Sequence, residues 1–263
     1  MASETRKVAI ITGASRGIGR ALALGLAADG WRIVVAAKSI ASSEKLPGSI
    51  YSVAQEIEAT GSEALPIQID VRDEAAIEGM VATTMTRFGR IDLLVNNAGA
   101  LFWQKLIDTP AKRFDLVMAV NARATFLCSR AVLPHMISQN WGHIINMSPP
   151  LDLGFVPGRI AYCISKFGMT LLTHGLAAEV RPHKIAVNSL WPRTIIESQA
   201  SINWGMGDRR HWRKPEILVD CVKRIVQKEP PQLSGQVLID EDFLLAEGVT
   251  DFSGYACVPE LKK

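Results

Sequence analysis

Apolar residues along the chain fall into short continuous runs, which are separated by longer segments of mixed character. Runs in which apolar residues do not alternate with polar ones are typical of strands that are covered on both faces of a sheet. The sequence therefore predicts seven buried strands, in the runs KVAIIT, WRIVVAA, ALPIQID, IDLLVNN, HIINMS, KIAVNSLW and GQVLID.

Helical patterns fill the segments between these runs, for example at residues 17–29, 51–60, 74–88 and 111–139. A strand followed by a helix and a second strand is the repeating unit of parallel sheets, and its crossover is right-handed. The pattern predicts an α/β protein with a single-domain Rossmann fold. In that fold a doubly wound, seven-stranded parallel sheet carries helices on both faces.

No linker, repeat or low-complexity stretch divides the sequence, so we expect residues 1–263 to form one domain. Residues 193–214 are too long and too mixed in character for a plain connection, and loops of this kind are often active-site lids. They are predicted to be a substrate lid, with an ordinary surface helix as the alternative. Residues 241–263 form an acidic and apolar tail to which the sequence assigns no function.

Composition and charge favour a small-molecule partner. The chain is 48% hydrophobic and has a net charge of only +3, so it creates no field that would favour nucleic acid or a membrane surface. The four cysteines lack the spacing of a metal site, so we expect no metal and interpret them as reduced thiols in a cytoplasmic protein. The apolar run near the N-terminus is too short for a secretory signal or a membrane span.

The first predicted strand runs into the loop TGASRGIG, with glycines at positions 13, 17 and 19. Glycines allow a tight turn and a close approach of the backbone to a pyrophosphate, whose charge is met by N–H groups at the start of the next helix. The spacing is wider than in the common dinucleotide fingerprint, and a purely structural glycine turn is the alternative.

The end of the second predicted strand indicates which dinucleotide would bind. Sites for NAD usually place an acid there, but this chain has Ala37 and Lys38. Arg16 and Lys38 would both face the 2′ position of the adenosine ribose, where cations suit a phosphate. The sequence thus favours NADP(H), unless both are solvated surface charges. At the ends of the next two strands, Asp70 and Val71 are placed to flank the adenine, and the segment NNAG follows at the same sheet edge.

Five motifs, TGASRGIG, NNAG, Asn121 in AVNARATF, Ser148 in INMS, and YCISK, resemble in order and approximate spacing those of the short-chain dehydrogenase/reductase family. The resemblance covers about residues 5–240. The segments AAKS, KLPGSIY, DVRDE, NMSPP and NSLWPRT look like those of a hydroxysteroid-dehydrogenase-like and citronellol-dehydrogenase-like branch. It implies that Tyr162 exchanges a proton with the substrate oxygen, Lys166 bonds the nicotinamide ribose, Ser148 bonds the substrate oxygen, and Asn121 holds a water in a proton relay.

The same resemblance places Thr194 against the nicotinamide carboxamide, after Pro192 and with Arg193 where glycine is more usual. The residues expected to contact the cofactor are Gly13, Ser15, Arg16, Gly17, Ile18, Gly19, Lys38, Asp70, Val71, Asn97, Ala98, Gly99, Tyr162, Lys166, Pro192 and Thr194. Each of these residues also has a structural alternative. The Tyr and Lys four residues apart would be an accidental surface pair, the Ser at the strand end would be a turn residue, and Asn121 would be a buried amide bonded to backbone.

Proton exchange at neutral pH requires a phenol that is more acidic than usual, because a free phenol titrates near pH 10. Lys166 lies one helical turn from Tyr162 and supplies positive charge. At roughly 4 Å and an effective dielectric constant of about 20, the attraction to a phenolate is about 4 kcal/mol, or about 3 pK units. We therefore expect Lys166 to lower the pKa of Tyr162, before any cost of desolvation.

The sequence thus predicts an NADP(H)-dependent oxidoreductase that interconverts a lipophilic alcohol and its aldehyde or ketone. Candidate pocket residues, with core packing as the competing role, are Trp103, Leu151, Phe155, Trp204, Met206 and Trp212. One alternative is a reductase of acyl-carrier or CoA-linked ketones, suggested by Arg209, Arg210 and Arg213. Another is a catalytically silent NADPH-binding protein. The resemblance also implies a homotetramer or homodimer formed through helices at residues 111–139 and 159–181.

Overall fold

Seven parallel strands form the centre of the computed structural model, which describes residues 6–44 and 46–258. The strands are β1 (Val8–Thr12), β2 (Arg32–Ala37), β3 (Ala64–Gln68), β4 (Leu93–Asn96), β5 (Gly142–Asn146), β6 (Ile185–Trp191) and β7 (Val237–Ile239). Their order across the sheet is β3-β2-β1-β4-β5-β6-β7. The predicted doubly wound, seven-stranded parallel sheet is confirmed, and each strand lies in one of the seven apolar runs. Residues 1–5 and 259–263 of the predicted domain and tail lie outside the described residues.

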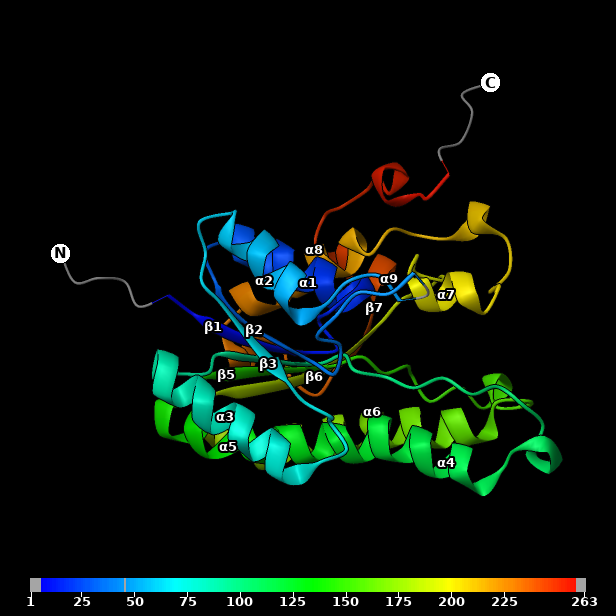
Figure 1. Ribbon diagram of the computed structural model, residues 1–263, viewed down its shortest axis with the longest axis horizontal. Helices are drawn as coiled ribbons and strands as arrows, with labels where there is room; N and C mark the ends of the chain where they lie inside the picture. The colour runs from blue at the N-terminus through cyan, green and yellow to red at the C-terminus, as the bar shows by residue number, and fades with distance from the viewer. Residues whose placement is uncertain (1–5, 45, 259–263) are drawn as a thin grey trace.

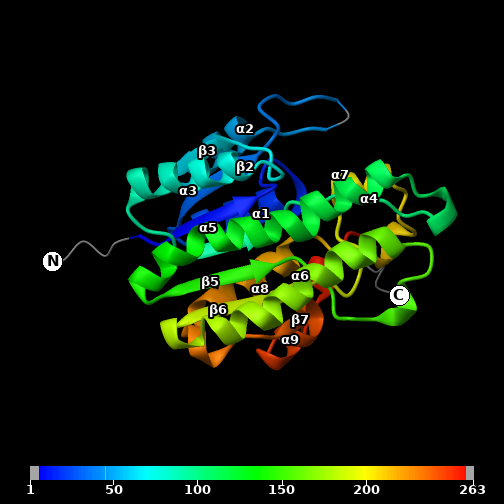
Figure 2. The same cartoon turned by 90° about the horizontal axis from the view of Figure 1, so that it is seen from below.

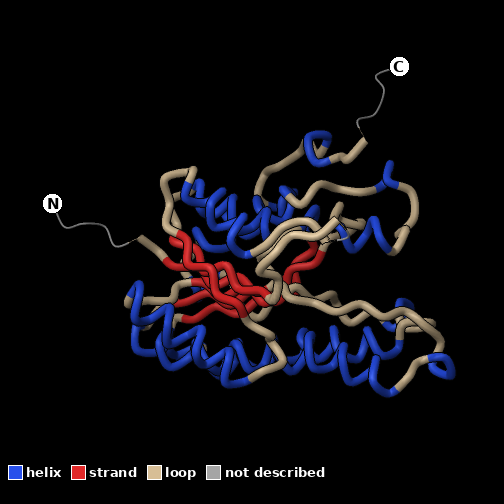
Figure 3. The backbone as a smooth tube through the Cα atoms, in the orientation of Figure 1, coloured by secondary structure: helices blue, strands red, loops and turns tan. Residues whose placement is uncertain are grey.

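Two layers of helices cover the sheet (Figures 1 and 3). One layer holds α1 (Gly17–Ala28), α2 (Ile50–Glu58), α8 (Glu216–Gln227) and α9 (Asp240–Ala246), and the other holds α3 (Glu74–Phe88), α4 (Ala111–Val117), α5 (Ala124–Gln139) and α6 (Ile160–Glu179). A short helix, α7 (Gln199–Asn203), lies within the predicted lid. Single turns of 3-10 helix occur in the connections, among them residues Leu106–Asp108, Leu153–Phe155, Arg209–His211 and Ser253–Tyr255.

Each strand contributes to two cores, because successive side chains point to opposite faces of a sheet. In β1, Ala9 and Ile11 pack with α1, α2 and α8, whereas Val8 and Ile10 pack with α3 and α5. All five residues of β1 are buried. Burial on both faces is the physical reason why the strands appear in the sequence as continuous apolar runs.

The ends of α3 illustrate how local sequence sets the helix boundaries. The Asp73 carboxylate accepts hydrogen bonds from the backbone N–H groups of Ala75 and Ala76, at 3.0 and 3.3 Å, and so caps the start of the helix. Gly89 ends it with a φ of 73°, a left-handed conformation that glycine adopts without a steric cost. The predicted helix at residues 74–88 is therefore confirmed.

The predicted helix at residues 111–139 is interrupted. A π-helical segment, Met118–Arg123, separates α4 from α5 and places Asn121 at its centre. This stretch, Ala111–Gln139, is also the one helix among the described residues that is long and apolar enough to cross a membrane, with a mean hydropathy of 1.4. Core helices pass the same test, and α5 packs against β4 and β5, so this observation is weak evidence for a span.

The chain reverses its direction of progress across the sheet between β1 and β4. From β1 the sheet is built outward to β2 and β3, and β4 then returns to the other side of β1. Open α/β sheets bind ligands at the carboxyl ends of the strands, at such a switch point. In Figure 3 the long loops extend from this end of the sheet.

Candidate functional site

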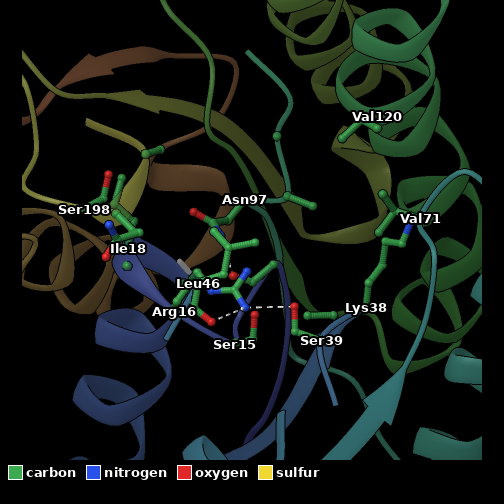
Figure 4. A pocket seen from close by; sticks show the side chains of 18 of the residues that line it. Ser15, Arg16, Ile18, Lys38, Ser39, Leu46, Val71, Asn97, Val120 and Ser198 are labelled. Atoms are coloured by element: carbon green, nitrogen blue, oxygen red, sulfur yellow. Dashed lines mark hydrogen bonds between the residues drawn. The ribbon is translucent and has the colours of Figure 1, made fainter. Parts of the chain in front are cut away.

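A cavity of about 610 Å³ opens at the switch point, above the carboxyl ends of β1 and β4 (Figure 4). The structure brings together in its lining all twelve cofactor residues predicted between positions 13 and 99, from the glycine loop, from the ends of β2 and β3, and from NNAG. Tyr162, Lys166, Pro192 and Thr194 are not part of this lining. The sequence did not indicate several other lining residues, which are Ser39, Leu46, Arg72, Leu116 and Val120, and it assigned Ser198, Gln199, Ala200, Asn203 and Trp204 to a substrate lid or pocket rather than to the cofactor site.

The glycine loop is shaped by close backbone contacts. Gly13 and Gly17 have φ values of 70° and 54°, and a Cβ atom on Gly19 would lie 2.4 Å from the Gly13 carbonyl oxygen. The following helix, α1, begins with no side-chain cap and no acidic residue in its first turn. Its first N–H groups and the positive end of its dipole therefore suit a pyrophosphate at this wall of the cavity.

Three cations surround the end of the cavity near β2 and β3. Arg16 donates hydrogen bonds to Ser39 Oγ at 2.9 Å and to the carbonyl oxygens of Pro47 and Gly48 at 3.2 and 3.1 Å (Figure 4). The other two, Lys38 and Arg72, face the Asp70 carboxylate at 3.0 and 2.5 Å.

The Asp70 carboxylate has a different surrounding from the one we expected. The hydrogen bond from Arg72, with help from Lys38, holds the pKa of Asp70 well below its usual range. The carboxylate is thus engaged by two cations of the chain, and its contact with an adenine amino group remains a prediction. Three cations against one carboxylate leave a positive excess, which suits a phosphate.

Lys166 lies deep beneath the NNAG loop. Its Nζ donates a 2.7 Å hydrogen bond to the Met147 carbonyl oxygen and lies 5.5 Å from the centre of the Trp191 ring. A Cβ atom on Gly99 would be 3.8 Å from the same Nζ. The ammonium is therefore placed between the ends of β4, β5 and β6.

The expected effect of Lys166 on Tyr162 is not found in the structure, and this prediction is corrected. Burial lowers the pKa of Lys166 to about 7, and burial raises the pKa of Tyr162 above its usual value. The sequence argument weighed the attraction between the two groups, but the cost of removing each from water is larger here. At neutral pH the Tyr162 phenol is protonated.

Ser148 is fully buried at the end of β5, where α6 fixes the backbone on both sides of it. Lys166 donates a hydrogen bond to the Met147 carbonyl oxygen, and the Thr170 hydroxyl donates to the Pro149 carbonyl oxygen at 2.6 Å. The Ser148 hydroxyl lies 2.8 Å from that of Ser189 in β6. Hydrogen bonds therefore hold both the backbone and the side chain of Ser148 in place.

The Asn121 amide, the buried side chain of the π-helical segment, makes three hydrogen bonds. Its Oδ1 accepts from the Ala100 N–H at 2.8 Å, and its Nδ2 donates to the Ala100 carbonyl at 3.0 Å and to Ser165 Oγ at 2.8 Å. These contacts correspond to the alternative of a buried amide bonded to backbone. π-Helical turns are frequent at functional sites, and Asn121 Oδ1 lies near Gly99, but the water relay stays a prediction.

An aromatic wall, formed by Trp103 and Phe155, stands beside Tyr162. The Trp103 ring meets those of Tyr162 and Phe155 edge to face, at centroid distances of 6.2 and 6.4 Å. The Arg159 guanidinium stacks on Trp103 and Phe155 at 4.8 and 4.3 Å. The structure therefore brings two of the predicted pocket residues together next to the candidate proton donor.

The other predicted pocket residues have different surroundings. Leu151 is half exposed, Trp204 lines the cofactor cavity, and Trp212 is buried with its Nε1 donating to the Met206 carbonyl at 3.0 Å. Trp212 and Met206 thus support the fold of residues 193–214. The three arginines that suggested a phosphorylated carrier each face a carboxylate, in the pairs Arg209–Glu197, Arg210–Asp208 and Arg213–Glu241. This pairing lends the acyl-carrier or CoA alternative no support.

Thr194 lies where the chain leaves β6. Its hydroxyl is buried and, among the described residues, has no hydrogen-bond partner. Arg193, which stands where glycine was expected, has no positive φ, and its backbone N–H donates to Asp240 Oδ1 at 2.8 Å. An unpartnered buried hydroxyl at the end of a strand suits a polar group of a bound molecule, such as a carboxamide.

Comparisons with known proteins agree with this geometry. The family model described as short chain dehydrogenase matches residues 7–205. Hydroxysteroid dehydrogenase-like protein 2 of Danio rerio is 44% identical over 266 residues, covering 98% of this chain and 64% of that protein. The human protein of that name is 46% identical over 252 residues, covering 95% and 60%. The chain therefore spans less than two thirds of the length of these relatives.

Solved structures share the fold. A short chain dehydrogenase from Mycobacterium thermoresistibile has a TM-score of 0.90 at 42% identity, covering 98% of this chain and 93% of that one. A metagenomic short-chain oxidoreductase in complex with NADP has a TM-score of 0.75 at 32% identity, covering 90% and 98%.

Proposed function

Because the chain belongs to the short-chain dehydrogenase family, we propose that it is an NADP(H)-dependent oxidoreductase that interconverts a lipophilic alcohol and its aldehyde or ketone. Tyr162 is the proposed proton donor and acceptor. The observation that carries the proposal is that Gly99 lines the cavity and a Cβ atom on it would lie 3.8 Å from the Nζ of Lys166, which shares α6 with the buried Tyr162.

The cavity residues fit NADP(H). The start of α1 suits the pyrophosphate, and Arg16, Lys38 and Arg72 provide the positive excess that a 2′-phosphate needs. At the other end, the unpartnered Thr194 hydroxyl supports a contact with the carboxamide, and Lys166 is the proposed ligand of the ribose hydroxyls. When bound, the cofactor supplies or accepts the hydride.

Protonation of Tyr162 fits a role as proton donor to a carbonyl oxygen. A free phenol is already protonated at physiological pH, and burial raises the pKa of Tyr162 further, so the proton is in place for the reductive direction. In the oxidative direction the phenol must lose that proton, and a positive charge on Lys166 would assist. The Ser148 hydroxyl, oriented by Ser189, is the proposed hydrogen-bond donor to the substrate oxygen.

The substrate side of the site is apolar. Trp103 packs edge to face against both Tyr162 and Phe155, and Arg159 is the one cation among the described residues that stacks on this wall. The exposed leucines Leu151 and Leu153 lie in the loop that precedes α6. Aromatic walls with few polar groups suit hydrophobic ligands. The relatives named hydroxysteroid dehydrogenase-like agree with an apolar alcohol or carbonyl as the substrate class.

We further propose that the protein assembles through α5 and α6, which lie side by side on one face (Figure 2). Phe126 on α5 and Ile164 and Leu171 on α6 are each about half exposed, at 51%, 46% and 60%. Exposed apolar side chains on neighbouring helices favour association of identical chains. Light scattering should therefore give the mass of a homodimer or homotetramer, and a monomer at micromolar concentration would refute this assembly.

The enzymatic proposal is tested with a panel of aliphatic, terpenoid and steroid alcohols and carbonyls, assayed with NADPH and NADH in parallel. Tyr162→Phe should lower kcat at least about 100-fold on any active substrate while leaving NADPH binding in place. Tyr51→Phe, at an exposed tyrosine on α2, is the matched control. Tight NADPH binding without turnover on the whole panel would favour the catalytically silent alternative.

A further inference from the structure

Three segments that are distant in the sequence meet at Arg213. The Arg213 N–H donates to the Ile195 carbonyl, and the Arg213 carbonyl accepts from the Glu197 N–H, both at 2.9 Å. On its other side, the Lys214 N–H donates to the Tyr255 carbonyl at 2.7 Å, and the Cys257 N–H donates to the Trp212 carbonyl at 3.2 Å. We call residues 252–257 the C-terminal strap, since they lie against the chain as it leaves the lid.

The strap is anchored to the body of the protein. The Tyr255 hydroxyl donates to Asp220 Oδ2 on α8 at 2.5 Å, and Lys214 Nζ donates to the Gly254 carbonyl at 3.1 Å. Phe252 and Tyr255 pack against the core that contains α1 and α8. The chain leaving the lid is therefore attached to a fixed structure through residues at the C-terminal end of the described chain.

Side chains add a second connection between the exit and the entry of the lid. Arg213 Nε bonds Glu241 at 2.9 Å, Glu241 also lies 3.6 Å from Arg193, and the Arg193 N–H donates to Asp240 Oδ1 at 2.8 Å. Arg193 directly precedes Thr194. The acidic segment that begins α9 thus holds both ends of the lid together.

The lid lies over the cofactor cavity. Between its two ends, Ser198, Gln199, Ala200, Asn203 and Trp204 line that cavity. A Cβ atom on Gly17 would be 3.4 Å from Ser198 Cβ, so α7 lies directly on the glycine loop. Within the lid, Ser201 Oγ donates to the Ile196 carbonyl at 2.9 Å, which braces α7 against the attached end.

We propose that the C-terminal strap positions the lid over the pyrophosphate and nicotinamide half of the cofactor, and that Arg213 and Tyr255 are positioning residues for NADP(H) retention. The inference rests on the proposed function, because it takes the cavity as the NADP(H) site. A lid that is held in place slows the release of a bound molecule, whereas a loosened lid lets it leave.

The test compares two ligands that differ in whether they reach the lid. NADPH extends past the glycine loop, whereas adenosine 2′-monophosphate, which has no 5′-phosphate, occupies only the adenosine end. Arg213→Gln, beside the strap, breaks the bond to Glu241, and Tyr255→Phe, within the strap, breaks the bond to Asp220. We call these two changes the strap variants. Arg210→Gln is the matched control, because Arg210 lies in the same lid but pairs with Asp208.

Each strap variant should weaken NADPH binding about fivefold and speed its release in stopped flow, with the binding of adenosine 2′-monophosphate unchanged. The control should bind both ligands as the wild type does. A wild-type affinity for NADPH in both strap variants would overturn the proposal. An equal loss for both ligands would also overturn it, because that result indicates general destabilisation rather than a misplaced lid.

Hydrogen exchange separates this inference from the proposed function. If the wild type binds no NADPH, the proposed function fails, yet the attachment of the lid can still be measured without nucleotide. Both strap variants should then exchange backbone hydrogens faster over residues 196–213 than wild type and Arg210→Gln do. Unchanged exchange in that segment would refute the attachment itself.

Discussion

Replacing Lys166 by methionine tests the electrostatics at the centre of the site. The lysine is buried in α6 with its Nζ bonded to the Met147 carbonyl at 2.7 Å, and burial lowers its pKa from 10.5 to about 7. The folded protein therefore binds this proton less tightly than the unfolded chain does. The resulting stability cost is fully present below about pH 7 and disappears as the pH rises towards 10.5.

The change in the free energy of unfolding follows from the pH range between the folded and unfolded pKa values of Lys166. Between pH 7 and 10.5 the free energy of unfolding gains about 1.4 kcal/mol for each pH unit from this one group. Lys166→Met abolishes the titration but leaves the Met147 carbonyl without its donor, at a cost of about 1–3 kcal/mol at every pH. Because half of the folded molecules have already lost this proton at pH 7, the wild type should gain about 2 kcal/mol relative to the variant between pH 7 and pH 9.

Urea unfolding of both proteins at pH 6, 7, 8 and 9, without nucleotide, measures this difference. Protein concentrations must match, since association also stabilises the folded state. Lys38→Met, at a lysine with a 64% exposed side chain, controls for the loss of one positive charge. Parallel curves for Lys166→Met and wild type would show that burial does not depress the pKa of Lys166, and the sequence-based expectation of an ammonium at neutral pH would then be restored.

Three further changes probe the cofactor and substrate sides. Lys38→Asp should lower the ratio of kcat/KM for NADPH over NADH at least about tenfold, because a second carboxylate beside Asp70 repels a 2′-phosphate; an unchanged ratio would remove the reason for choosing NADP(H). Gly19→Ala should abolish NADPH binding in a fluorescence titration, since its Cβ would lie 2.4 Å from the Gly13 carbonyl oxygen, and wild-type affinity would refute this geometry. Trp103→Ala should raise the KM for an apolar substrate about tenfold with the KM for NADPH unchanged, and equal effects on both would place Trp103 outside the substrate pocket.

The strands and the first half of the site were predictable because their signals are local. Residues of β1 alternate between two cores, so burial on both faces leaves an uninterrupted apolar run in the sequence. Three cofactor-cavity residues directly follow a strand, namely Gly13, Lys38 and Asn97, and Asp70 lies two residues after the end of β3. Parallel strands end at one edge of the sheet. Their convergence on one cavity therefore follows from the topology alone.

The π-helical segment around Asn121 was not predictable, because one extra residue in a helical turn leaves the spacing of apolar residues almost unchanged. The position of α7 was also hidden. Residues 193–214 were expected to cover a substrate, whereas Ser198 and Trp204 line the cofactor cavity. Their placement depends on contacts at Arg213 that no local pattern encodes.

Lys166 and Tyr162 show where an argument from spacing fails. Four residues on a helix bring two side chains to one face, and the attraction between opposite charges at that distance is several kcal/mol. That attraction acts only if both groups carry charge, and burial opposes the charged form of each. The Lys166 ammonium is held by the Met147 carbonyl rather than by the phenol. The sequence shows the distance between the two groups but not their exposure to water.

The residue that departs from the family pattern after β6 lies beside the acidic start of α9. Arg193 stands where glycine is more usual, and the acidic segment Asp240 to Asp242 directly follows β7. β6 and β7 pair so that Trp191 faces Ile239, which brings the residues after each strand together. Arg193 then donates its N–H to Asp240 and its guanidinium to Asp242 and Glu241. The bond to Asp240 comes from the backbone and would form with glycine as well, whereas the half-exposed Arg193 guanidinium gains carboxylate neighbours that are identified only once the strand register is known.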